Sequence, residues 1–384
     1  MKFEFATANQ IIFGEGVLSQ VGEISSELGE NTLIVAGGGS VPINSLIKIL
    51  ETGRISNTVF RVHSEPDIIT VMEGVELAKN NHCDFVIGFG GGSVLDTAKA
   101  IAAMLTNPGQ LVDYLEVIGS GKQIINQAAP MIAIPTTAGT GTEVTSNAVI
   151  ASPEHQIKVS LRSRKMIPTI ALVDPELTYT MPAKVTANTG MEPLTQVIES
   201  YVSNRANIMT DIISERGIKL GAGALLKAFL DGEDRKARHD MSITSLFGGL
   251  ALANGGLGAV HGFAGPIGGM FNVPHGLLCA CLLPYVIKYN IKTLETFELG
   301  EEIRNRYLDI AKWVTGDPLA EINDGIYWIQ ELAKSLNIPG LRDLGIHPQD
   351  FDIIIEKSKS ASSMQKNPVK LEEKILRAIL EEAY

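Results

Sequence analysis

Short apolar runs alternate with amphipathic stretches through roughly the first half of the chain. The runs predict buried strands at 32–36, 59–62, 85–87, 131–134 and 170–173, and residues 11–16 predict a strand end and turn. Apolar residues at helical spacing predict the helices between them, at 17–28, 41–50, 68–80 and 94–105. This alternation is typical of a doubly wound parallel sheet covered by helices on both faces.

The pattern changes at Pro182, after which no strand is predicted and helical periodicity continues to Tyr384. We therefore expect an N-terminal α/β domain over residues 1–182 and a C-terminal helical domain over 183–384. A chain of 384 residues is long enough to give both domains a core.

A glycine cluster follows the predicted strand at 85–87. Four of the five residues 88–92 are glycine, and Ser93 and Asp96 have the spacing of a capping box that starts a helix. Free N–H groups and the helix dipole at such a helix start favour phosphate. Ser93 replaces the third glycine of GxGxxG, so a tight connection without a ligand is the alternative. The residues of this segment predicted to bind a dinucleotide cofactor are Gly90, Gly91, Gly92, Ser93 and Asp96.

A second glycine cluster, Gly37, Gly38 and Gly39 with Ser40, follows the strand at 32–36. Many dinucleotide-binding domains carry an acidic residue at such a strand end, where it binds the ribose 2′-hydroxyl. These four residues carry no negative charge and leave room for a 2′-phosphate. They favour NADP(H) over NAD(H), although a carboxylate from elsewhere in the chain would restore NAD(H), and a simple turn is the alternative.

A threonine-rich loop follows the strand at 131–134. Pro135 ends that strand, and the loop then offers four hydroxyls among glycines, from Thr136, Thr137, Thr140 and Thr142. Hydroxyls and free N–H groups suit a pyrophosphate or the nicotinamide amide. A polar loop without a ligand is the alternative.

The overall charge limits the class of partner. A net charge of -11 argues against nucleic acid or an anionic membrane surface as the main partner. The N-terminus has no apolar signal region, and no charge-free run is long enough to span a bilayer. Cys83, Cys279 and Cys281 have no metal-knuckle or disulfide spacing, so we expect packed thiols in a reducing cytoplasm.

Long motifs in both halves resemble the iron-containing (group III) alcohol dehydrogenase family. They are FGEG at 13–16, GFGGGSVLDTAKA at 88–100, PTTAGTGTEVT at 135–145, VDPELT at 173–178, TGMEPLTQVIESYVS at 189–203 and VHGFAGPIGGMFNVPHG at 260–276. The resemblance covers nearly the whole chain. It implies a Rossmann-like dinucleotide-binding domain, a helical domain and an active site between them, with hydride transfer between NAD(P) and small alcohols or aldehydes. It also suggests a homo-oligomer, a dimer or larger.

The resemblance implies a divalent metal, Fe or Zn, at four positions of this chain. Two of them keep the family's histidines, His261 and His275, whereas Glu192 and Gln196 stand where the family has aspartate and histidine. Glutamate is still a hard oxygen ligand, but a glutamine carbonyl is a weak substitute for imidazole. The alternative is a metal-free pocket like that of the related maleylacetate reductases. A further family histidine is replaced by Gly265.

Reducing an aldehyde requires that the negative charge growing on oxygen be met by a Lewis acid or a proton donor. His261 and His275 are the predicted catalytic residues, as metal ligands or as an imidazolium donor. Lys158 is a third candidate because the family has a lysine at a similar point after the threonine loop; a surface charge is the alternative. The leading hypothesis is an NAD(P)-dependent reductase of small aldehydes or ketones. The others are a lyase related to dehydroquinate synthase and a binding protein that has lost its metal site.

Overall fold

The computed structural model describes residues 2–38, 43–152, 154–155, 157–295 and 300–384. The chain separates into two compact units. The α/β unit contains Ala6–Thr137 and Gly141–Thr180. The helical unit contains Met181–Tyr384, the short stretch Ala138–Thr140 and the residues before Ala6. The expected boundary at Pro182 lies next to Met181.

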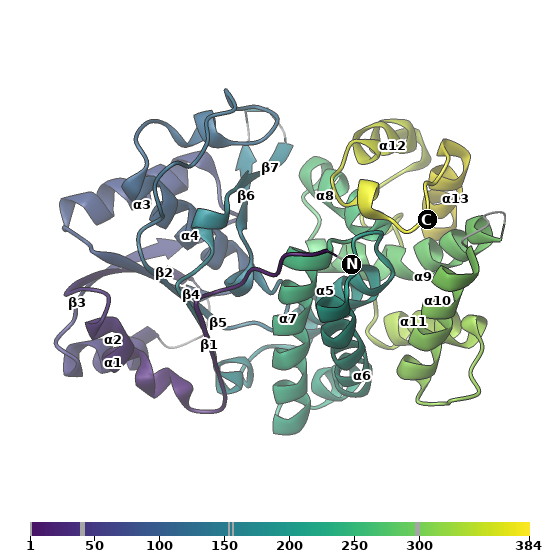
Figure 1. The fold of residues 1–384 in the computed structure, drawn as a ribbon, viewed down its shortest axis with the longest axis horizontal. Helices are drawn as coiled ribbons and strands as arrows, with labels where there is room; N and C mark the ends of the chain where they lie inside the picture. Colours follow the sequence, from purple (N-terminus) through teal and green to yellow (C-terminus); the bar gives the residue numbers. More distant parts are fainter. Residues whose placement is uncertain (1, 39–42, 153, 156, 296–299) are drawn as a thin grey trace. The chain divides into compact units, whose positions relative to one another are not determined.

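A six-stranded parallel sheet forms the centre of the α/β unit (Figure 1). Its strands are β1 (Gln10–Phe13), β2 (Asn31–Gly37), β3 (Ser56–Val62), β4 (Phe85–Gly90), β5 (Met131–Pro135) and β8 (Ile170–Val173). Their order across the sheet is β1-β8-β5-β4-β2-β3. Neighbouring strands β2, β4 and β5 therefore end at the same edge, and each is followed by one of the three predicted binding motifs.

Helices cover both faces of this sheet, which confirms the doubly wound architecture (Figure 1). They are α1 (Val21–Ser26), α2 (Ile43–Thr52), α3 (Ile68–Asn80) and α4 (Gly92–Thr106). Alternate strand residues face opposite layers. Leu33 and Val35 pack in the core with α3 and α4, whereas Ile34 and Ala36 pack with α1 and α2. Short 3-10 helices occupy Val17–Gln20, Leu111–Tyr114, Thr142–Val144, Arg164–Met166 and Pro175–Thr178.

The glycine cluster differs from its prediction. Strand β4 runs through Gly90, and α4 already begins at Gly92 with Gly91 as its N-cap. A β carbon at Gly90 would lie only 2.6 Å from a methyl group of Val94, so glycine lets the helix pack closely against the strand. The predicted capping box of Ser93 and Asp96 is wrong, because no side chain caps α4.

Two further predictions for the α/β unit are wrong in detail. The helix expected at 17–28 is a 3-10 turn followed by the short α1. The antiparallel hairpin of β6 (Asn147–Ser152) and β7 (Ile157–Arg162) was not predicted as a pair of strands. Its strands pair with each other and not with the main sheet, and their buried residues alternate with more exposed ones, unlike the fully buried strands β4 and β5.

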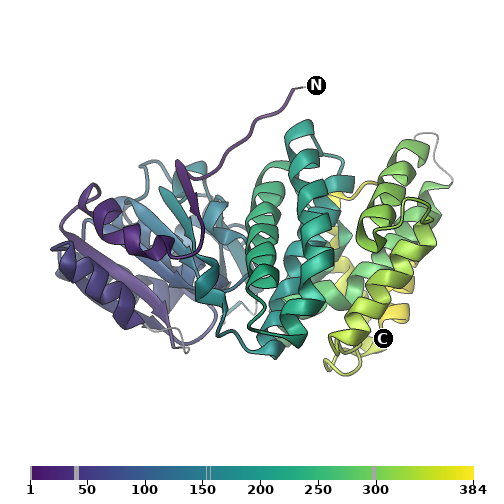
Figure 2. The same cartoon turned by 90° about the horizontal axis from the view of Figure 1, so that it is seen from below.

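The helical unit contains nine α-helices among the residues that the structure describes, and α5, α6 and α7 stand side by side (Figure 2). They are α5 (Ala183–Val202), α6 (Ile208–Leu230), α7 (Arg235–Gly255), α8 (Ala259–Phe271), α9 (His275–Leu294), α10 (Gly300–Thr315), α11 (Ile322–Ser335), α12 (Phe351–Lys359) and α13 (Glu373–Ala383), with 3-10 turns at Pro348–Asp350 and Met364–Lys366. Helix α9 has the length and apolar composition of a membrane span, but 67% of that stretch is buried inside the protein, as in a central core helix.

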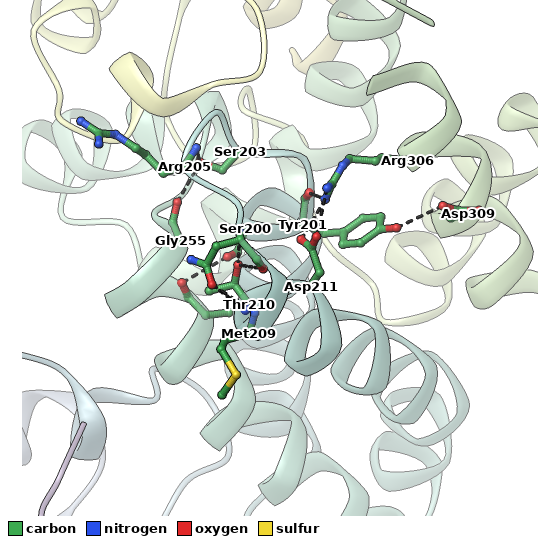
Figure 3. A network of polar contacts seen from close by, with 12 residues as sticks. Ser200, Tyr201, Ser203, Arg205, Met209, Thr210, Asp211, Gly255, Arg306 and Asp309 are labelled. Carbon is green, nitrogen blue, oxygen red and sulfur yellow. Dashed lines mark hydrogen bonds and ion pairs between the residues drawn. The ribbon is translucent and has the colours of Figure 1, made fainter. Parts of the chain in front are cut away.

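A polar network ties the C-terminal end of α5 to α6 and α10 (Figure 3). Arg306 of α10 binds both carboxylate oxygens of Asp211, at 2.8 and 3.0 Å, and donates to the backbone oxygen of Tyr201 at 2.7 Å. The Tyr201 hydroxyl donates to Asp309 at 3.0 Å. A bidentate guanidinium–carboxylate pair has a fixed geometry. The network therefore holds α5 in place, and α5 carries several of the site residues described next.

Candidate active site

Two of the predicted binding motifs meet where β4 and β5 end. The backbone N–H of Thr136 donates to Gly90 O at 3.0 Å, and a β carbon at Gly91 would lie 3.3 Å from Thr137 Oγ1. The third motif follows the adjacent strand β2, where Gly37 and Gly38 are described but Gly39 and Ser40 lie outside the described residues. Ligands of parallel sheets bind at this edge. Dinucleotide binding by these residues, including Gly92 and Ser93 at the start of α4, stays a prediction.

Asp96 and Thr142 are bonded to the protein itself. The Thr142 hydroxyl donates to Asp96 at 2.5 Å, and Val149 N donates to the other Asp96 oxygen at 2.9 Å. Lys99, which is fully buried, donates to the hydroxyls of Thr142 and Thr145 at 2.6 and 3.0 Å. Burial lowers the pKa of Lys99, and the nearby Asp96 charge opposes that change. This network anchors the threonine loop to α4, so Asp96 and Thr142 position the loop whether or not they touch a cofactor.

Lys158 lies on β7 in the α/β unit and forms an ion pair with Glu65 at 3.4 Å. An ion pair of this kind requires no catalytic role for the lysine. A catalytic role for Lys158 stays a prediction.

Three buried polar side chains lie on one face of α5: Glu192, Gln196 and Glu199. Their i, i+4, i+7 spacing puts them on the same stripe of the helix. Gln196 Nε2 donates to Thr140 O at 3.1 Å and to Glu192 Oε1 at 3.4 Å. Its Oε1 lies against Gly248 of α7 and accepts no hydrogen bond from any described residue. The side-chain amide of Gln196 therefore helps to hold Glu192 in place. A role for Gln196 as a metal ligand stays a prediction.

Glu199 was given no role from sequence, but it organises His261. Its Oε2 lies 2.6 Å from Nδ1 of His261, and both side chains are buried. Its Oε1 accepts the backbone N–H of Val260 at 2.7 Å, at the start of α8. A carboxylate on Nδ1 fixes the ring and the tautomer, so that Nε2 of His261 is the nitrogen available for chemistry. The sequence signal for this residue was its spacing of seven from Glu192, which places both carboxylates on the same face of α5.

His275 and Cys279 stand beside His261. The two histidine rings have centroids 5.2 Å apart, and Cys279 Sγ lies 3.8 Å from His261 Nε2. One potential ligand atom from each of the three residues lies within 4.8 Å of the others, and His275 is the most accessible of the three. Burial, with smaller contributions from the charges of Glu192 and Glu199, raises the pKa of the Cys279 thiol well above its usual value. From sequence Cys279 was expected only as a packed thiol, and it is indeed free and buried.

The start of α9 lies very close to α5. A β carbon at Gly276 would come within 1.7 Å of Asn188 O and 3.6 Å of Glu192 Cβ. Glycine at 276 therefore places His275 against the helix that carries Glu192 and Glu199. On α8, a β carbon at Gly265 would meet nothing within 4 Å, so the position where the family has a further histidine is open.

The donor set fits a divalent cation. The side chains of His261 and Glu199 form the carboxylate–histidine arrangement typical of metal ligands, and imidazole nitrogen is a common ligand for Zn and Fe. Glu192 and Glu199 bring two buried carboxylates to the same region. A cation is favoured where buried negative charge gathers in this way.

The family models support the resemblance over both halves. Residues 8–175 match iron-containing alcohol dehydrogenase, and residues 186–384 match the C-terminal domain of the Fe-containing alcohol dehydrogenase family. The chain belongs to this family. It is thus an oxidoreductase that interconverts alcohols with aldehydes, and the family implies NAD(P) and a divalent metal as cofactors.

Individual relatives cover the whole chain. It is 34% identical to the 1,3-propanediol dehydrogenase of Citrobacter freundii, over 100% of this chain and 99% of the relative. It is also 34% identical to the NADPH-dependent butanol dehydrogenase of Clostridium saccharobutylicum, over 99% and 97%. A solved 1,3-propanediol oxidoreductase superposes with a TM-score of 0.93 at 31% identity, covering 100% of both chains.

Proposed function

We propose that this protein reduces a small aldehyde or ketone to the alcohol with NADPH, and that alcohol oxidation is favoured at high pH. The observation that carries the proposal is the buried His261–Glu199 pair with the His275 ring beside it. Relatives named for 1,3-propanediol and butanol support a short, uncharged substrate.

In this proposal, residues of the helical unit stabilise the negative charge that develops on the substrate oxygen. When bound, a reduced nicotinamide would supply a hydride to the carbonyl carbon, and a divalent metal would supply a Lewis acid for the carbonyl oxygen, on which negative charge develops. His261, oriented by Glu199, and His275 would hold the metal, with Glu192 as a nearby oxygen donor. Without metal, a protonated imidazole of the pair delivers the proton that turns the alkoxide into the alcohol. Both routes need His261 held by Glu199 so that Nε2 is available, as a metal ligand in one route and as the proton donor in the other.

A preference for NADP(H) has two supports at the end of β2. Gly37 and Gly38 carry no carboxylate that would repel a 2′-phosphate. Arg61 of β3 donates to Gly37 O at 2.8 Å, which puts a guanidinium at the same strand end. Arginine binds phosphate well because its donors match the oxygen geometry. Arg61→Ala is expected to raise KM for NADPH about tenfold or more and to leave KM for NADH nearly unchanged.

The test of the function is nicotinamide oxidation with purified protein. Straight-chain aldehydes of two to six carbons are supplied with NADPH or NADH, and absorbance of the reduced cofactor is followed. We expect turnover with NADPH that His261→Ala lowers at least about a hundredfold. No oxidation of either cofactor with any aldehyde, ketone or keto acid would overturn the proposal.

We also infer that the protein acts in the cytoplasm as a homo-oligomer. Three free cysteines suit a reducing compartment. Light scattering coupled to size-exclusion chromatography tests the oligomeric state, and a monomer at micromolar concentration would contradict it.

A further inference from the structure

We propose that Cys279 is a metal ligand, so that this chain holds its divalent cation through His261 Nε2, a ring nitrogen of His275 and the Cys279 thiolate. The inference rests on the proposed function in that it concerns the same site, but it is tested by metal binding and not by turnover. Glu192 and Gln196 stand where the family has an aspartate and a histidine as ligands, so His261 and His275 are the family ligands that remain. Cys279 lies close enough to both histidines to complete the ligand set.

The first support is distance. Zn–N and Zn–S bonds of about 2.1 and 2.3 Å at a tetrahedral angle put nitrogen and sulfur about 3.6 Å apart. His261 Nε2 and Cys279 Sγ are 3.8 Å apart. The three ligand atoms all lie within 4.8 Å of one another, so small side-chain rotations bring them to one ion.

The second support is how the ligands are held. His275 and Cys279 are four residues apart at the start of α9, so they project from the same face of the helix. His261 comes from α8, where Glu199 occupies its Nδ1 at 2.6 Å and turns Nε2 toward the sulfur. Three protein ligands leave a fourth position for the substrate oxygen, as in catalytic zinc sites with two cysteines and one histidine.

The third support is charge. When a divalent cation binds, the Cys279 thiol loses its proton to solvent and the sulfur–metal bond takes its place. The resulting centre keeps one positive charge, and it lies near the buried carboxylates of Glu192 and Glu199. A soft thiolate ligand selects Zn²⁺ or Co²⁺ over a hard ion such as Mg²⁺. We therefore expect wild type to bind Zn²⁺ more tightly than Cys279→Ser, which has only nitrogen and oxygen donors.

The experiment compares two buried cysteines on the same helix. Cys281 lies two residues beyond Cys279, and its thiol donates to Ala383 O at 3.6 Å, away from the histidines. The chain is stripped with a chelator and titrated with Co²⁺, as wild type, Cys279→Ser and Cys281→Ser. A thiolate–Co²⁺ charge-transfer band in the near ultraviolet should appear in wild type and Cys281→Ser and be absent in Cys279→Ser. X-ray absorption of the zinc form should show one sulfur at about 2.3 Å.

The outcomes separate the alternatives. A metal bound without sulfur in its shell, or a charge-transfer band that survives in Cys279→Ser, would overturn the proposal. So would the absence of Co²⁺ and Zn²⁺ binding in wild type, even if the metal-free protein reduces aldehydes and thereby upholds the proposed function. Loss of binding in Glu192→Gln together with unchanged binding in Cys279→Ser would also overturn it. Circular dichroism of every variant shows whether the fold is retained.

Discussion

At the scale of single residues, Glu199 is the side chain on which the most chemistry depends. It touches neither cofactor nor substrate in our proposal, but it orients His261 through Nδ1. Glu199→Gln keeps an oxygen for Val260 N and removes the charge. We expect kcat to fall about 10- to 100-fold, with a changed pH profile of kcat/KM and little loss of stability. Glu215→Gln on α6, which removes the same charge at a partly exposed position paired with Lys219, is the control.

Glu143 supports a prediction about pH. It is buried in the threonine loop, and burial raises its pKa from 4.5 to about 7. A carboxyl with a raised folded-state pKa contributes stability that is full below pH 4.5 and is lost as pH rises through about 7. The shift corresponds to about 3 kcal/mol. Wild type should therefore lose stability over this window relative to Glu143→Gln, by urea denaturation at several pH values. A difference in stability between wild type and Glu143→Gln that stays constant across this pH range would contradict the prediction. The control is Glu23→Gln, at an exposed position.

The site residues show what a sequence can and does not reveal. His261 and His275 were found because they sit in motifs shared with the family, and the structure brings their rings together. Cys279 and Glu199 were missed, although each lies at helical spacing from a residue that was found. Helical spacing identifies a shared face, but it does not say which face turns toward a second helix. That information comes only from how α5, α8 and α9 pack.

At the scale of elements, the contact between α5 and α9 requires glycine at 276. A β carbon there would overlap Asn188 O, at 1.7 Å. We expect Gly276→Ala to lower the free energy of unfolding by about 3 kcal/mol, because the backbones must separate. Gly265→Ala on α8 is the matched control, since its β carbon meets nothing and alanine gains up to about 1 kcal/mol of helix propensity. Urea denaturation measures both; equal stabilities would show that the helices tolerate separation.

The elements themselves were largely predictable where hydrophobic patterns are strong. Helix α3 runs from Ile68 to Asn80 as expected, and the buried strands β2, β4 and β5 lie where the apolar runs are. The hairpin of β6 and β7 was missed although residues 148–151 form an apolar run, and α1 is shorter than the helix expected at 17–28. Gly88 and Gly90, which we expected to follow the strand, lie within β4 and allow close packing there.

At the scale of the whole molecule, the fold class follows from the change of periodicity near residue 180, which separates a sheet-centred half from a helical half. Each unit has its own hydrophobic core. Both tryptophans, Trp313 and Trp328, lie in the helical unit, on α10 and α11. Tryptophan fluorescence therefore reports unfolding of that unit alone, whereas circular dichroism reports both.

This separation gives a test of where each ligand binds. In our proposal NADP⁺ binds the α/β unit and the metal binds the helical unit. At a hundredfold excess over Kd a ligand stabilises the folded state by about 2.7 kcal/mol. Zinc should therefore move the fluorescence-detected urea midpoint upward. NADP⁺ should raise the urea midpoint of the unfolding transition that circular dichroism detects and tryptophan fluorescence does not. A zinc shift confined to the circular dichroism signal, or an NADP⁺ shift confined to the fluorescence signal, would contradict this assignment of ligands to units.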